Sequence, residues 1–160
     1  MNTLTPTFII AIFSFGTAIF YALSCVEWSV LRLGLNQHSR AVDDSDVRFV
    51  HAALKRLTPL LPPANGVVIL FGTAAMVYQG VLRNWDAASI AVLAFYWLVT
   101  GYLITFGKIA AAVKDRRQTN SQGDIEDVRR GVSRLIVRHH IGLAANLGAV
   151  ILTFVLLLWR

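Results

Sequence analysis

The stretch PTFIIAIFSFGTAIFYALSCV, residues 6–26, contains no charged side chain and no histidine. A transmembrane helix needs about 20 mostly apolar residues to cross a hydrocarbon core of about 30 Å. The stretch therefore predicts a membrane-spanning helix. No Lys or Arg precedes it, which argues against a cleaved signal peptide and favours a retained span.

Three further stretches of the same kind lie at 59–80, 86–107 and 141–159. Only a few residues around Asn84 and Trp85 separate the second span from the third, so these two must form a tight antiparallel hairpin. The chain of 160 residues is 56% apolar and 15% charged, whereas soluble domains contain about 25% charged residues. The sequence thus predicts a single domain, 1–160, that is an all-α integral membrane four-helix bundle.

Basic residues are divided unevenly among the connections between these spans. Thirteen of the fifteen Lys and Arg residues lie in 27–58 or 108–140, and only Arg83 and Arg160 lie elsewhere. By the positive-inside rule, both long connections are cytoplasmic and both termini lie on the opposite side, in a bacterial-type inner membrane. Anionic lipid headgroups account for the net charge of +6, so the lipid bilayer is an expected partner and a nucleic acid is not.

Both cytoplasmic connections show helical periodicity as they approach the next span. Apolar residues recur at helical spacing over 47–57 and again over 128–136. Helices two and four are therefore expected to begin near Asp46 and Asp124, to continue unbroken into the membrane and to protrude on the cytoplasmic side. The Pro-Pro pair at 62–63 is expected to kink helix two.

Polar side chains recur at one depth in all four spans. At a rise of about 1.5 Å per residue, one side chain from each span lies roughly 21–24 Å from the outer end. These residues are Tyr21, Asn65, Tyr102 and Asn146. Glu27, Lys108 and His139 lie roughly 30–33 Å in, where hydrocarbon gives way to headgroups. The sequence predicts that the first four line one interior site, which the other three cap.

Plainer explanations stay open for these residues. Asn and Tyr in membrane helices often only hydrogen-bond to neighbouring helices, and Glu27 with Lys108 would suit an ion pair at the membrane boundary. His51 is expected to be solvated on an exposed helix face. A non-haem iron site would need Glu27, His51 and His139 as two imidazoles and one carboxylate. No motif spacing supports that set, and no cofactor is expected.

Three segments stand out beside this polar layer. They are Gly16-Thr17-Ala18-Ile19-Phe20-Tyr21-Ala22-Leu23-Ser24, Thr58-Pro59-Leu60-Leu61-Pro62-Pro63 and Arg138-His139-His140. With these segments the chain resembles a family of small four-span membrane proteins described as anthrone-oxygenase-like. The resemblance implies a cofactor-free oxygenase that oxidises planar polyketide anthrones to anthraquinones.

This activity would begin when a base removes a proton from a CH₂ group beside a carbonyl. His139 fits this role best and Glu27 second, because the base should titrate near neutrality. The residues expected to bind the substrate are Tyr21, Asn65, Tyr102, Asn146 and Lys108. The substrate would be a planar hydrophobic molecule, polyketide or quinol-like, in the cytoplasmic leaflet. The alternatives are a non-catalytic subunit or scaffold, in a homo-oligomer or a larger membrane complex, and a metal-dependent oxidoreductase.

Overall fold

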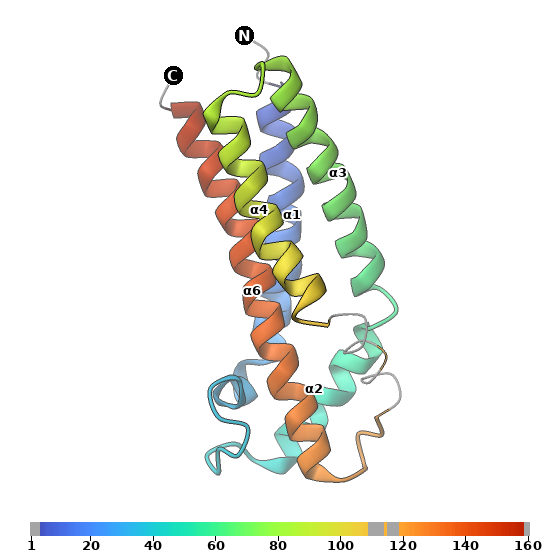
Figure 1. The fold of residues 1–160 in the computed structure, drawn as a ribbon. Helices are drawn as coiled ribbons and strands as arrows, with labels where there is room; N and C mark the ends of the chain where they lie inside the picture. The colour runs from blue at the N-terminus through green and yellow to red at the C-terminus, as the bar shows by residue number, and fades with distance from the viewer. Residues whose placement is uncertain (1–3, 109–113, 115–118, 159–160) are drawn as a thin grey trace.

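The computed structural model describes residues 4–108, 114 and 119–158, and every regular element within them is helical (Figure 1). Four helices are long and apolar enough to cross a membrane. They are α1 (Leu4–Val26), α3 (Leu61–Leu82), α4 (Ala87–Thr105) and α6 (Ile125–Leu158). A 3₁₀-helix, η1 (Trp28–Gly34), and the short helix α2 (Asp44–Leu57) connect α1 to α3. The prediction of an all-α chain with four such helices is confirmed.

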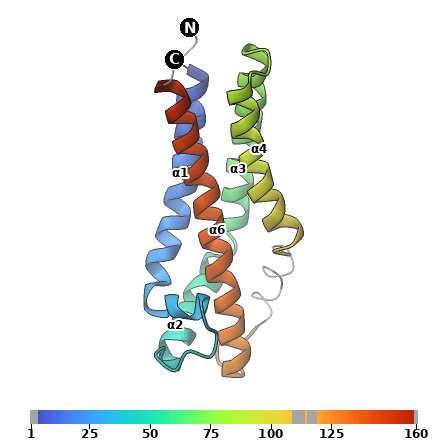
Figure 2. The same ribbon diagram turned by 60° about the vertical axis from the view of Figure 1, so that its left-hand side comes forward.

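The four long helices run side by side (Figures 1 and 2). α1 packs against α3 and α6, and α4 packs against the same two helices. The start of α1, the end of α6 and the α3–α4 turn lie at one end of the molecule, and α2 lies at the other. The first and last helices of the chain are therefore direct neighbours.

Aromatic rings pack onto glycines where the long helices meet. The Phe13 ring of α1 covers Gly72 of α3 so closely that a Cβ on Gly72 would lie 2.5 Å from the ring. Phe20 of α1 covers Gly142 of α6 in the same way. Small residues at such contacts let membrane helices approach closely, and close packing is what associates helices in lipid.

The α3–α4 connection is a tight turn, as its short length predicts. Asn84 and Trp85 have positive φ angles of 50° and 54°, and the Trp85 N–H donates to the Gly80 carbonyl at 2.7 Å. Asp86 then caps α4 by accepting a hydrogen bond from the Ser89 N–H at 2.9 Å. The turn needs few residues because it satisfies the free backbone groups at both helix ends itself.

The helix α6 begins at Ile125, as the periodicity predicts, and continues unbroken to Leu158. It is 34 residues long. At about 1.5 Å per residue a helix of this length extends roughly 51 Å, about 20 Å more than a hydrocarbon core. Its first turns pack with α2 and η1 around a second apolar core that includes Val50 and Val132. Arg129 of α6 forms a hydrogen bond with the loop before α2, in which it donates to the Val42 carbonyl at 2.7 Å.

The prediction that helix two runs unbroken from Asp46 into the membrane is wrong. The helix α2 ends at Leu57, residues 58–60 form a turn, and α3 starts separately at Leu61. Pro62 and Pro63 lie in the first turn of α3, where backbone N–H groups have no acceptor within the helix. The prolines therefore start this helix instead of kinking it. Nothing in the apolar periodicity predicts η1.

Candidate functional site

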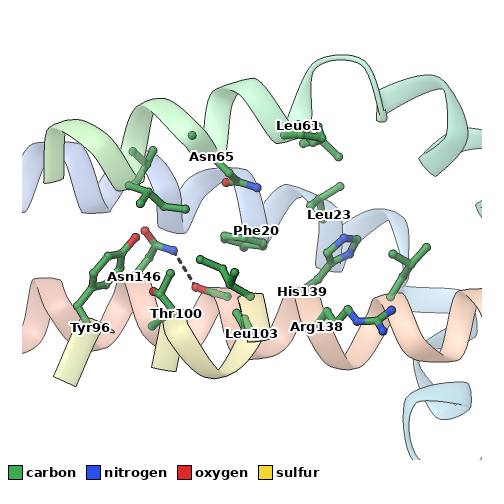
Figure 3. Close-up of a pocket in the computed structure, with 18 residues that line it drawn as sticks. Phe20, Leu23, Leu61, Asn65, Tyr96, Thr100, Leu103, Arg138, His139 and Asn146 are labelled. Carbon is green, nitrogen blue, oxygen red and sulfur yellow. Dashed lines mark hydrogen bonds between the residues drawn. The ribbon is translucent and has the colours of Figure 1, made fainter. Parts of the chain in front are cut away.

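A cavity of about 220 Å³ lies among the four long helices, in the half of the molecule nearer to α2 (Figure 3). Most of its wall is apolar, with Phe20 and Leu23 contributed by α1. Its polar side chains are Asn65 of α3, Tyr96 and Thr100 of α4, and Arg138, His139 and Asn146 of α6. An apolar cavity with a few convergent polar groups is the usual form of a small-molecule site.

A buried histidine–carboxyl pair lies at this cavity. His139 Nδ1 is 2.5 Å from Glu27 Oε1. The Glu27 side chain is 0% exposed, and His139 is 8% exposed. The two residues, which are predicted only to cap one site, are thus in direct contact, and His139 also lines the cavity. A carboxyl group on Nδ1 fixes the orientation of the imidazole ring and leaves Nε2 for other partners.

Glu27 is held at the junction of α1 and η1. Its backbone N–H donates to the Leu23 carbonyl at 2.9 Å, and its carbonyl accepts from the Val30 N–H at 3.0 Å. Its second carboxyl oxygen, Oε2, is buried with no hydrogen-bond partner among the described residues. A buried carboxyl that is only half satisfied costs stability. Such costs are concentrated at functional sites.

Two residues of the predicted polar layer reach the cavity. Asn65 is half-buried, and its side chain points into the cavity (Figure 3). Asn146 is buried, but its side-chain N–H donates to the Gly142 carbonyl at 2.8 Å, and its Oδ1 packs against Gly16. Asn65 is therefore the amide better placed to bind a ligand.

Tyr21 and Tyr102 do not line the cavity, and the prediction that they line one interior site is wrong. Lys108, which is predicted to cap that site, does not line the cavity either. The Tyr21 and Tyr102 side chains are 64% and 55% exposed. Lys108 is exposed beyond the end of α4. The inward face of α4 carries Tyr96 and Thr100 instead. One position along a helix turns a side chain by about 100°, so a small error in choosing the face exchanges inward and outward residues.

Tyr96, Thr100 and Arg138 are cavity residues that the depth argument missed. On α4, Val92, Tyr96 and Thr100 follow one another at four-residue steps and are all buried. That spacing is a helical-face signal and was present in the sequence. Arg138 has no separate signal in the sequence, because it belongs to the group of basic residues in 108–140.

His51 is buried, and the prediction that it is solvated is wrong. Its side chain is 1% exposed, and its Nδ1 lies 2.8 Å from Ser121 Oγ. The turn before α6 covers this face of α2, where Arg48 and Lys55 also donate to carbonyls of the same turn. In the part of the chain that the structure describes, no group of three or more His, Cys, Asp or Glu side chains could hold a metal ion. The iron-binding set that would include His51 is therefore not assembled.

No family model, curated protein or solved structure matches this chain. The cavity and the His139–Glu27 pair therefore carry the functional argument.

Proposed function

We propose that this chain is a membrane-embedded, cofactor-independent oxygenase in which His139 removes a proton from a hydrophobic substrate. One observation carries the proposal: a buried imidazole, paired through Nδ1 with a buried carboxyl, lines a mostly apolar cavity. A base that is held in one orientation by a neighbouring group, here the Glu27 carboxyl, is typical of proton transfer in enzymes.

The reaction would start at a CH₂ group that an adjacent carbonyl makes acidic. His139 takes the proton, which leaves an enolate, and Asn65 donates a hydrogen bond to the enolate oxygen. The enolate carbon reacts with O₂, the oxidant, to form a hydroperoxide that then loses water. One CH₂ and one O₂ thus give one new carbonyl and one water.

The volume of the cavity limits the size of the substrate. The cavity measures about 220 Å³. Benzene binds in an engineered cavity of about 150 Å³, and drug-sized ligands occupy pockets of roughly 300–1,000 Å³. A planar compound of one or two fused rings therefore fits this cavity better than a three-ring anthrone.

The proposed location of the site is the cytoplasmic half of a bilayer. His139 precedes the end of α6 by a helix length of about 28 Å, at 1.5 Å per residue. It then lies near the inner edge of a hydrocarbon core of about 30 Å. Under the positive-inside rule the basic residues of α2 and of the first turns of α6 face the cytoplasm. In this orientation the four long helices form a membrane bundle, and α2 protrudes with the start of α6.

Proton abstraction can be measured with a probe, 2-tetralone, which is a two-ring ketone with an acidic CH₂. The readout is exchange of that CH₂ with D₂O, catalysed by the protein in phosphatidylcholine nanodiscs. We expect His139→Gln, which keeps a hydrogen-bond donor for Glu27, to lower the exchange rate by about 10²–10⁴-fold. His140→Gln is the matched control. His140 is the next residue in α6, but its Nδ1 donates to the Ile136 carbonyl at 2.8 Å and it is not part of the described cavity wall.

Oxygen uptake is the second readout. An oxygen electrode should record one O₂ consumed for each carbonyl formed, and His139→Gln should abolish this uptake. Exchange no faster than in empty nanodiscs, or unchanged exchange in His139→Gln, would contradict the role of His139 as the base. Exchange without oxygen uptake would remove the oxygenase assignment.

A non-catalytic membrane subunit is the second candidate, and the outward position of Tyr21 and Tyr102 favours it. Both side chains are exposed on the surfaces of long helices, where a helix of another chain could hydrogen-bond to them. The purified chain would then be inactive and would form a larger assembly in mild detergent. Tyr21→Phe combined with Tyr102→Phe should reduce that assembly.

A further inference from the structure

We propose that the side chains of Tyr96 and Thr100, the hydroxyl pair, form a second polar end of the cavity and bind an uncharged oxygen of the ligand at a distance from His139. This inference rests on the proposed function and deepens it, because it names a group that the substrate carries besides the acidic CH₂. The substrate that fits is an uncharged ring ketone with a second oxygen on its far ring.

The hydroxyl pair lies toward the end of the cavity opposite His139 (Figure 3). Phe95, the residue before Tyr96, packs against α6 at Gly148, where an added Cβ would lie 2.5 Å from the Phe95 ring. Tyr96 therefore lies near the level of Asn146, which also lines the cavity. Asn146 follows His139 by roughly 10 Å along α6, at about 1.5 Å per residue. A ligand of one or two rings is long enough to bridge this separation.

The hydrogen bonding of Thr100 differs from that of Thr17 and Thr153 in the other long helices. These two hydroxyls donate to the carbonyl four positions earlier in their own helix, at 2.8 Å in each case. Threonine in a helix often bonds back in this way. Within the described residues, the Thr100 hydroxyl donates to no carbonyl of α4, and its side chain interacts with that of Tyr96 instead. The Thr100 hydroxyl can therefore bond to groups in the cavity.

The hydroxyl pair keeps one proton for a ligand. Each hydroxyl has one proton to donate and can also accept hydrogen bonds. A hydrogen bond between the two hydroxyls uses one of their two protons, so the other proton is left to donate into the cavity. Both side chains are buried in a mostly apolar wall, where a donor without an acceptor is unfavourable. An uncharged ligand oxygen supplies the acceptor without bringing an unpaired charge into this wall.

The Tyr96 ring is held in place by aromatic neighbours. The centroids of the Tyr96 and Phe13 rings are 4.6 Å apart, and the Trp97 ring lies edge-on to Tyr96 at 6.4 Å. A donor that is fixed before binding loses little conformational entropy when the ligand arrives. Tyr96 should therefore discriminate between an oxygen and a methyl group of similar size at this end of the cavity.

The preference for an oxygen can be tested with two probes of similar size, 6-hydroxy-2-tetralone and 6-methyl-2-tetralone. In both probes the ketone and the substituent lie at opposite corners of the two-ring skeleton. Equilibrium binding is measured to the protein in phosphatidylcholine nanodiscs, with binding to empty nanodiscs subtracted. We expect the hydroxy probe to bind about tenfold more tightly than the methyl probe, because only the hydroxy probe offers an oxygen to the hydroxyl pair.

The double variant Tyr96→Phe/Thr100→Val removes both hydroxyls with little change in size. We expect its affinities for the two probes to lie within about twofold of each other. Tyr102→Phe/Thr105→Val is the matched control, because Tyr102 and Thr105 are exposed on the same helix and lie outside the described cavity wall. A preference for the hydroxy probe that persists in Tyr96→Phe/Thr100→Val, or that the control loses equally, would overturn the assignment of the hydroxyl pair.

Binding of the methyl probe reports whether the double variant is folded, because this probe needs no hydrogen bond from the hydroxyl pair. If the double variant does not bind the methyl probe, the smaller change Thr100→Val is measured alone. We expect Thr100→Val to reduce the preference for the hydroxy probe by about threefold or more. An unchanged preference in Thr100→Val would overturn the proposal.

The hydroxyl pair and the base fail separately in these experiments. His139→Gln should keep the preference for the hydroxy probe while it loses the exchange of 2-tetralone. A wild-type protein with no preference for the hydroxy probe would overturn this inference and leave proton abstraction by His139 intact. A wild-type protein with this preference but without exchange would do the reverse.

Discussion

At the scale of single residues, the pair of Glu27 and His139 has the largest energetic consequences. Both side chains are buried, and one hydrogen bond joins His139 Nδ1 to Glu27 Oε1. A buried polar pair adds little to stability compared with apolar residues of similar size, but removal of one partner leaves the other buried and unpaired. The two residues should therefore be strongly coupled.

This coupling predicts a non-additive pair of substitutions. Glu27→Ala should lower the free energy of unfolding by about 3–5 kcal/mol, because His139 loses its buried partner. The double variant Glu27→Leu/His139→Phe should lose less free energy of unfolding than the single variants Glu27→Leu and His139→Phe lose together. Chemical unfolding in mixed micelles measures all four proteins of the cycle. Additive costs would show that the two side chains do not depend on each other.

Depth along a helix was predictable at this scale, and facing was not. A boundary error of one residue moves a side chain by about 1.5 Å along the axis but turns it by about 100°. Asn65 and Asn146 accordingly reach the cavity, whereas Tyr102 points outward and Thr100, two positions earlier, points inward. The similar depth of Glu27 and His139 was predictable from their positions along the helices, but their pairing was not, because Lys108 was an equally suitable partner for Glu27.

At the scale of helices and turns, length and apolar character were sufficient to predict the four long helices. The early start of α6 could also be predicted, because its apolar periodicity continues from residue 128 into the apolar stretch 141–159. The break between α2 and α3 could not, since a Pro-Pro pair is compatible with a kink inside a helix and with the start of a new one. In the structure a new helix starts at the Pro-Pro pair, and α2 packs against α6. This packing is a tertiary contact, so the local sequence does not show it.

The contacts between helices predict opposite effects for two glycine substitutions. Gly72→Ala should destabilise the protein by about 1–3 kcal/mol, because the added methyl group would overlap the buried Phe13 ring. Gly131→Ala in α6 should stabilise it by about 0.5–1 kcal/mol, since an added Cβ there meets nothing within 4 Å and alanine favours the helix. Thermal unfolding of both variants in the same detergent provides the comparison. Equal effects would contradict the close contact of α1 with α3.

At the scale of the whole molecule, the arrangement of the helices places the start of α1 and the end of α6 at one end (Figure 1). The other end contains η1, α2 and the first turns of α6, where most of the basic residues lie. The structure therefore separates a weakly charged end from a basic end. The proposed sides of the membrane for these two ends rest on the charge distribution alone.

The orientation predicts the behaviour of fusions at the C-terminus. Alkaline phosphatase fused after Arg160 should be active in a bacterial host, because it folds only outside the cytoplasm. Green fluorescent protein exported by the same route at that position should be dark. Insertion of either reporter at Gln122, in the turn before α6, should give the opposite result. Fluorescence of the C-terminal fusion would reverse the proposed topology.

The pairing of the first helix with the last has a further consequence for biosynthesis. Glu27 and His139 are 112 positions apart in the chain. A ribosome that adds about 5–20 residues per second makes Glu27 roughly 6–22 s before its partner. During that interval the nascent chain carries the Glu27 carboxyl group without the His139 imidazole beside it. If His139 is the base, as proposed, a chain that is truncated before α6 should catalyse no proton transfer.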